Sequence, residues 1–129
     1  MPSIIYVEDD PLAGEVVSQI LHDAGHHCGV VADGCAALET ILSTKPEMII
    51  VDLELPGMSG IEVIRALRVR SGTHLMTILA LTAHADAALH QEVMLAGANA
   101  VLTKYVYEND FVARVDQVFR SNTFRKAHA

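Results

Sequence analysis

The sequence predicts an α/β domain in which a mostly parallel sheet is covered by helices on both faces. Apolar runs of strand length alternate with amphipathic stretches of helix length five times along the 129 residues. Each crossover through a helix returns the chain to the same edge of the sheet, so that the strands become parallel. The third and fourth runs are apolar at nearly every position, which is typical of strands covered on both faces.

The boundaries of the elements follow from the same patterns. Strands are expected at 3–7, 27–31, 48–52, 76–81 and 99–103, and helices at 11–24, 35–44, 58–70, 85–96 and 108–121. Asp10 can cap the first helix with Pro11 in its first position, and Gly25 ends it. The apolar face of that helix comprises Leu12, Val16, Val17, Ile20 and Leu21, and that of the last helix Phe111, Val112, Val115, Val118 and Phe119.

Length and charge limit the possible functions. The chain suits one domain, expected at 1–121, with 122–129 as a flexible C-terminal tail. A net charge of −7, with nine scattered Lys and Arg residues, argues against a nucleic-acid surface. Because no apolar run approaches the ~20 residues of a membrane span and no secretory signal opens the chain, we expect a cytoplasmic protein without a membrane partner.

The cysteines and histidines do not form a metal-binding pattern. Cys28 and Cys35 are too far apart for a C-x-x-C motif, and ordinary thiols are expected. Among the seven histidines, His22 and His26 are separated by the helix-ending glycine, and His84 and His90 do not share a helix face. Surface histidines are therefore expected rather than a zinc site.

Carboxylates gather where strands of the predicted sheet end. Glu8, Asp9 and Asp10 directly follow the first strand, and Asp52 ends the third. Two such charges about 4 Å apart repel by roughly 4 kcal/mol at an effective dielectric constant near 20. The cluster therefore requires protons, a basic side chain or a divalent cation, and oxygen ligands of this kind suit Mg²⁺.

Two further side chains belong to the same predicted edge. Thr82 follows the fourth strand and Lys104 the fifth. A carboxylate nucleophile, a cation, a lysine and a hydroxyl together fit the transfer of a phosphoryl group to a carboxylate. The alternative for Thr82 is the N-cap of the fourth helix, and for Lys104 a surface lysine. Asp10 is interpreted as a helix cap rather than a ligand.

Four motifs in order resemble those of a response-regulator receiver domain of two-component signalling. They are V-E-D-D-P after the first strand, D-L-E-L-P-G-M-S-G after the third, L-T-A after the fourth, and G-A-N-A-V-L-T-K through the fifth. The resemblance covers about 3–121, and it implies a flavodoxin-like fold with five parallel strands in the order 2-1-3-4-5.

The resemblance also implies a role for each site residue. Asp52 would be the phosphoacceptor, supplied by the phosphohistidine of a sensor histidine kinase or a histidine phosphotransfer protein. Asp9 would ligate Mg²⁺ directly and Glu8 chiefly through water, with the Asp52 side chain and the Glu54 carbonyl completing the protein ligands. The groups around the phosphoryl oxygens would be the Thr82 hydroxyl, the Ala83 backbone N–H and the Lys104 ammonium.

The chain departs from the family pattern at two positions. Val101 stands where most receivers carry an aromatic residue, and Tyr105 where a proline usually follows the lysine. We therefore expect phosphorylation to change the face formed by the fourth helix, the fifth strand and the fifth helix less than in aromatic-bearing receivers, unless Tyr105 or Tyr107 takes over the aromatic role.

The expected function is that of a stand-alone receiver that signals to a downstream target protein by protein contacts. It would catalyse only its own phosphorylation and dephosphorylation. One alternative is a phosphate shuttle that passes the group from Asp52 to another histidine in a phosphorelay. Another is a Mg²⁺-dependent phosphatase of the haloacid-dehalogenase type, in which Glu54 would be the second acid. The P-G-M-S-G continuation and the lack of room for a cap domain disfavour that reading.

Overall fold

The computed structural model describes residues 3–104 and 108–128, with the backbone alone of residues 108 and 109. Strands and helices alternate strictly through it. The strands are β1 (Ser3–Val7), β2 (His27–Val31), β3 (Met48–Asp52), β4 (Thr77–Thr82) and β5 (Ala100–Thr103). The helices are α1 (Pro11–Asp23), α2 (Gly34–Thr44), α3 (Gly60–Arg68), α4 (Ala87–Ala96) and α5 (Glu108–Ala127).

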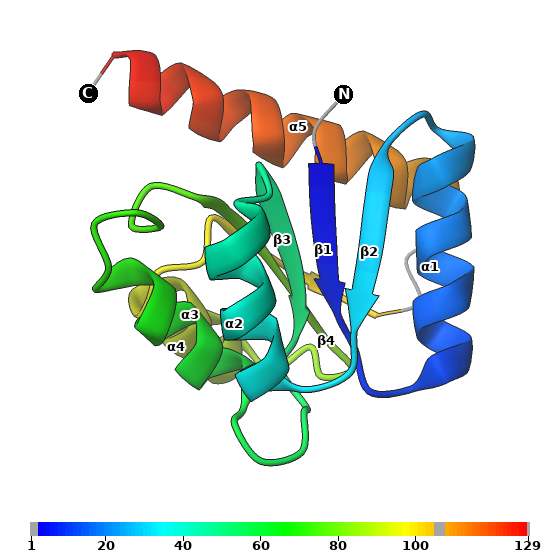
Figure 1. Cartoon of the computed structure of the whole chain (residues 1–129), viewed down its shortest axis with the longest axis horizontal. Coiled ribbons are helices and arrows are strands. Elements are labelled where there is room, and N and C mark those ends of the chain that lie inside the picture. Colours follow the sequence, from blue (N-terminus) through cyan, green and yellow to red (C-terminus); the bar gives the residue numbers. More distant parts are fainter. Residues whose placement is uncertain (1–2, 105–107, 129) are drawn as a thin grey trace.

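The five strands form one parallel sheet in the order β2-β1-β3-β4-β5, as predicted. The arrows of β1, β2 and β3 in Figure 1 point to the lower edge of the sheet, and both chain ends lie toward the upper edge. We call these the carboxyl edge and the amino edge. From β1 the chain adds β2 on one side, and it then adds β3, β4 and β5 in turn on the other side. The order of strands therefore switches between β1 and β3, which is where crevices at the carboxyl edge arise in folds of this kind.

Two apolar cores lie on opposite faces of the sheet. Side chains alternate along each strand, so that Ile5 and Val7 of β1 pack beneath α2, α3 and α4, whereas Ile4 and Tyr6 pack beneath α1 and α5. Strands β3 and β4 are buried at every residue. This explains their nearly continuous apolar sequences.

The predicted boundaries of the first three strands are those of the structure, and the other elements shift by one or two residues except at the C-terminus. Helix α5 continues to Ala127, so the prediction that regular structure ends near residue 121 was wrong. Asn122 is 7 % exposed, and its amide donates to the Leu75 carbonyl at 3.1 Å and to the Thr77 hydroxyl at 2.7 Å. These contacts attach the helix to β4 beyond the predicted end. No described helix is long and apolar enough to cross a membrane.

The first helix buries less of its apolar face than the periodicity suggests. Asp10 caps it as predicted, accepting a hydrogen bond from Leu12 N at 3.1 Å, with Pro11 in the first turn. Leu21 is fully buried, but Leu12 is 69 % and Val16 49 % exposed. These two side chains border a groove of about 320 Å³ between α1 and α5 instead of lying under α5.

His26 is buried rather than on the surface, which corrects the prediction made for it. Its side chain lies between the end of α1 and α5, with Nε2 3.0 Å from Asp116 Oδ1. The sequence pattern missed this because an isolated histidine after a helix-ending glycine carries no signal of burial. Cys28 and Cys35 are free thiols as expected, and burial raises the pKa of Cys28 to about 11.

Candidate phosphoacceptor site

Asp52 is the last residue of β3 and lies at the carboxyl edge with only 1 % of its surface exposed. One carboxylate oxygen, Oδ1, accepts a hydrogen bond from the backbone N–H of Glu54 at 3.0 Å. The other, Oδ2, is 2.6 Å from Lys104 Nζ. A buried carboxylate needs such partners, because an unpaired buried charge is strongly disfavoured.

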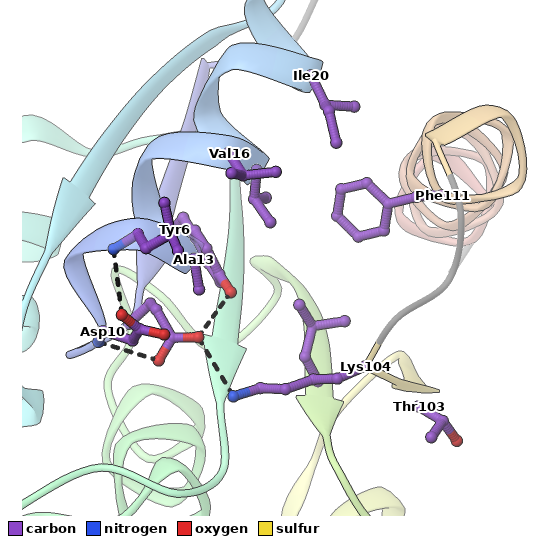
Figure 2. Close-up of a pocket in the computed structure, with 12 residues that line it drawn as sticks. Tyr6, Asp10, Ala13, Val16, Ile20, Thr103, Lys104 and Phe111 are labelled. Atoms are coloured by element: carbon purple, nitrogen blue, oxygen red, sulfur yellow. Dashed lines mark hydrogen bonds and ion pairs between the residues drawn. The ribbon is translucent and has the colours of Figure 1, made fainter.

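Glu8 directly follows β1 and is also buried, with 2 % exposed. Its Oε1 lies 3.2 Å from Lys104 Nζ and accepts a hydrogen bond from the Tyr6 hydroxyl at 3.0 Å. Figure 2 shows the Tyr6 hydroxyl and the Lys104 ammonium approaching this carboxylate from two sides. Lys104 thus bridges the acids that follow two neighbouring strands.

The pKa shifts in this cluster reflect burial together with the charges of close neighbours. Burial raises the pKa of Glu8, and Asp52 raises it further, whereas Lys104 and the Tyr6 hydrogen bond oppose the change. Burial tends to lower the pKa of Lys104, but Asp52 and Glu8 together outweigh it and raise the pKa. Burial and the Glu8 charge raise the pKa of Tyr6, which keeps its hydroxyl protonated.

Asp9 completes an acidic triad with Glu8 and Asp52. Each of the three can offer a carboxylate oxygen, and these atoms lie within 4.8 Å of one another. Unlike the other two, Asp9 is exposed to solvent. Three oxygen donors, of which that of Asp9 is on the solvent side, fit a Mg²⁺ ion, which keeps several water ligands.

The loop after β3 is held close to Asp52 by Gly60 at the start of α3. A Cβ atom at Gly60 would collide with the Asp52 carbonyl oxygen and would lie 2.7 Å from Leu53 Cα, so only glycine allows this approach. A capping box between Ser59 and Glu62 fixes the start of the helix. The M-S-G end of the motif therefore positions the loop that carries Glu54.

Thr82 ends β4 with its side chain fully buried. The alternative that it caps α4 is wrong, because Asp86 is the N-cap, and Thr82 Oγ1 instead accepts from the His84 N–H at 3.1 Å. The Thr82 carbonyl accepts from the Lys104 N–H at 2.6 Å. This last contact joins the ends of β4 and β5 beside Asp52, and Ala83 follows Thr82 as an exposed residue.

Two contacts at the site were not predicted from the sequence. The first is the hydrogen bond from Tyr6 to Glu8. Tyr6 lies in an apolar run, and its position two residues before Glu8 places both side chains on one face of an extended chain. The exposed pair His84 and Glu54 lies 3.3 Å apart across the mouth of the site. It joins the loops after β4 and β3, and no local pattern indicates it. The prediction that Tyr105 or Tyr107 takes over the aromatic role falls outside the described residues.

Comparison with known proteins agrees with this geometry. The family model for the response regulator receiver domain matches residues 4–116. The chain belongs to the response regulator receiver family. It is 35 % identical over 119 residues to the DNA-binding response regulator MtrA of Mycolicibacterium smegmatis, and 32 % identical over 120 residues to the sensory transduction protein RegX3 of Mycobacterium bovis. These matches cover 92 % and 93 % of this chain but 51 % and 52 % of the relatives, so the chain spans about half their length.

Solved receiver structures have the same fold. The chemotaxis response regulator CheY4 of Vibrio cholerae superposes with a TM-score of 0.87 at 30 % identity, covering 92 % of this chain and 98 % of that one. The BeF₃-activated N-terminal receiver domain of Klebsiella pneumoniae RstA gives a TM-score of 0.86 at 28 % identity, covering 92 % and 98 %. The family and the fold predicted from the sequence are thus confirmed.

Proposed function

We propose that this receiver accepts a phosphoryl group on the carboxylate of Asp52, with Mg²⁺ held at Glu8, Asp9 and Asp52. The observation that carries the proposal is the buried Asp52 carboxylate, 2.6 Å from the Lys104 ammonium and beside two further acids. A carboxylate oxygen would attack the donor phosphorus as the bond from phosphorus to the donor's histidine nitrogen breaks, and with a proton already on its other ring nitrogen the imidazole leaves as the neutral base. An acyl phosphate forms without any other co-reactant.

Each remaining group has a task at that centre. Bound Mg²⁺ would neutralise charge on the phosphoryl oxygens, and the Glu54 carbonyl is proposed as a further ligand. Lys104 would pair with a phosphoryl oxygen once Asp52 is phosphorylated, since its ammonium already lies beside the Asp52 carboxylate. The Thr82 hydroxyl and the Ala83 backbone N–H, next to each other at the end of β4, would donate to the other oxygens.

The proposed phosphodonor is a sensor histidine kinase or a histidine phosphotransfer protein. It would approach over the first turns of α1, where Leu12 and Val16 are exposed beside the groove that leads to Glu8 and Lys104. Figure 2 shows Val16 and Phe111 on opposite walls of that groove. An apolar rim next to a charged centre suits a protein donor better than a free phosphate ester.

Output is proposed to run through contacts with a downstream protein. Val101, in the position of the usual aromatic residue, is half-buried against the core beneath α4 and is too small to alternate between a pocket and solvent. Coupling to the α4–β5–α5 face is therefore expected to differ from that of aromatic-bearing receivers. The name of MtrA assigns DNA binding to that longer relative, so the absence of nucleic-acid contacts in this protein stays a prediction, as does its cytoplasmic location.

The decisive test is phosphorylation of Asp52→Ala by acetyl phosphate with Mg²⁺, followed by intact mass. The parent protein should gain one phosphoryl group as a slowly decaying acyl phosphate, and the variant none. Asp10→Asn is the matched control, because it removes a nearby charge but keeps a side chain that can cap α1. Incorporation that survives in Asp52→Ala would refute the assignment. Rapid turnover of phosphomonoesters by the parent would instead favour the phosphatase reading, and transfer to a histidine phosphotransfer protein the relay.

A further inference from the structure

Tyr6 is the aromatic residue of β1, beside Ile4, Ile5 and Val7, and its hydroxyl is directed at the proposed site. Its side chain is 1 % exposed and packs in the core beneath α1 and α5. The hydroxyl donates to Glu8 Oε1 at 3.0 Å within the buried interior. A phenylalanine would fill the same space, so the hydroxyl is not needed for packing.

The oxygen that Tyr6 contacts is the one shared with Lys104. Glu8 Oε1 lies 3.0 Å from the Tyr6 hydroxyl and 3.2 Å from Lys104 Nζ, and the same Nζ is 2.6 Å from Asp52 Oδ2. These contacts form a continuous chain from hydroxyl to carboxylate to ammonium to acceptor carboxylate. Its members come from the ends of β1, β3 and β5.

We propose that the Tyr6 hydroxyl is a positioning group that holds the Glu8 carboxylate, and through it Lys104, in the arrangement needed for cation binding and phosphoryl transfer at Asp52. This inference rests on the proposed function. Tyr6 touches none of the reacting atoms, so it acts through Glu8. Glutamate has one more rotatable bond than aspartate, and a buried donor removes that freedom before the cation arrives.

The contacts of the other Glu8 oxygen show why this constraint matters. Oε2 meets the Asp10 N–H at 3.5 Å, at the outer limit of a hydrogen bond. Without the tyrosine hydroxyl, the carboxylate would be held firmly by Lys104 alone among its described neighbours. It would then be free to turn toward that lysine and draw it from Asp52. Displacements of about 1 Å are enough to reduce such reactions substantially.

The test is Tyr6→Phe, which removes one oxygen atom and keeps the ring. We expect Mg²⁺ affinity by isothermal titration to fall about tenfold, as when other groups that orient metal ligands are lost. We also expect slower phosphorylation by acetyl phosphate at saturating Mg²⁺. Unchanged Mg²⁺ affinity together with an unchanged phosphorylation rate would overturn the inference, even if the variant were less stable.

The matched control is Thr73→Val, which removes another buried hydroxyl. Thr73 is 5 % exposed and donates to the Leu67 carbonyl at 2.6 Å, in the loop before β4 and away from the acids. This variant should lose stability but keep the parental Mg²⁺ affinity. An equal loss of affinity in both variants would mean that general destabilisation is the cause, and the positioning role would be refuted.

A double-mutant cycle asks whether Tyr6 acts through Glu8. Glu8→Gln should weaken Mg²⁺ binding, and adding Tyr6→Phe to it should cause little further loss. Additive losses would refute the proposed path. As a measurement that needs no variant, the Tyr6 ring carbon Cζ, labelled with ¹³C, should shift when Mg²⁺ is added to the parent protein, and an unmoved signal would also refute it.

Mg²⁺ binding separates an error in the role of Tyr6 from an error in the proposed function. Asp9→Ala serves as the reference, since loss of a direct ligand should weaken Mg²⁺ binding at least about tenfold. If parent and Asp9→Ala bind Mg²⁺ equally and Asp52 takes no phosphate, the proposed function is wrong. If Asp9→Ala is weakened and Tyr6→Phe is not, only the role of Tyr6 is wrong.

Discussion

The polar side chains at the amino and carboxyl edges of the sheet are paired in different ways. At the amino edge, the Arg68 guanidinium donates to the carbonyls of Gly97, Thr73 and His74 and to the Asn99 side chain, at 2.8–3.4 Å. Asn99 in turn donates to Asn122 at 3.2 Å. At the carboxyl edge, Glu8, Asp9 and Asp52 gather around Lys104.

The difference lies in the balance of charge. At the amino edge one cation meets neutral carbonyls and amides, and each contact satisfies a donor and an acceptor without repulsion. At the carboxyl edge, three carboxylates face one ammonium within the described residues, so like charges crowd together. The first arrangement stabilises the fold, whereas the second retains an unfavourable excess of negative charge, as the proposed cation site requires.

The largest effect on stability is therefore expected at the amino edge. Asn122→Ala should lower the free energy of unfolding by about 2–3 kcal/mol, because the Thr77 hydroxyl, the Leu75 carbonyl and the Asn99 amide each lose a buried partner. Urea denaturation measures this. Ser121→Ala, at an exposed neighbour on the same helix, is the control and should change little. A loss of phosphorylation in folded Asn122→Ala would contradict the separation of the two edges.

Removing the cation of the carboxyl edge should have a smaller effect. Lys104→Ala should lower the free energy of unfolding by about 1–2 kcal/mol in the absence of Mg²⁺, since Glu8 can take up a proton in compensation. Asp52→Ala, in contrast, should melt at the same temperature as the parent or higher, because it relieves repulsion. Thermal denaturation of both variants, with exposed Lys126→Ala as control, tests the comparison. A strongly destabilised Asp52→Ala would show that the Asp52 carboxylate stabilises the fold after all.

The smallest effect is a pH dependence that belongs to the carboxyl edge. Because burial and Asp52 raise the pKa of Glu8, the folded protein binds that proton more tightly than the unfolded chain. This contribution makes the free energy of unfolding fall as the pH rises from the ordinary pKa of glutamate toward the raised pKa of Glu8. Above both pKa values the contribution no longer changes with pH. Glu8→Gln should remove this part of the slope in Mg²⁺-free urea titrations from about pH 4 to pH 8.

The control for the pH profile is Glu92→Gln, which removes the same charge from the exposed side of α4. It should keep the parental slope between the ordinary and the raised glutamate pKa. A parental slope in Glu8→Gln would mean that another group of the cluster carries the extra proton.

Most of the fold could be predicted from the chain because its signals are local. The two-faced burial of β3 appears as a continuous apolar run, and Asp10 with Pro11 marks the start of α1 within a few residues. Asp52, Lys104 and Glu8 could be assigned to one site because each follows a strand of a parallel sheet. The roles carried over from the family remain proposals, and the structure shows which of these side chains are in contact.

The errors arose where partners are distant in sequence. The end of α5 depends on Asn122 meeting Thr77, and the burial of His26 depends on its place beside Asp116. The exposure of Leu12 and Val16 depends on how α5 packs beside α1. Helical periodicity reports which residues share a face, and it does not report how far a neighbouring element covers that face.

Local patterns along the chain were enough to predict the alternation of strands and helices, the Asp10 cap of α1 and the set of charged residues at one edge, because these depend on residues close together in sequence. The pairing of these charges depends on contacts between strands that are far apart in sequence, because Lys104 joins Glu8 to Asp52. The Tyr6 hydroxyl donates to Glu8 from the opposite side, and this contact is local in sequence. The balance of burial and charge at Asp52 is set by those contacts, and with it the chemistry that the site can perform.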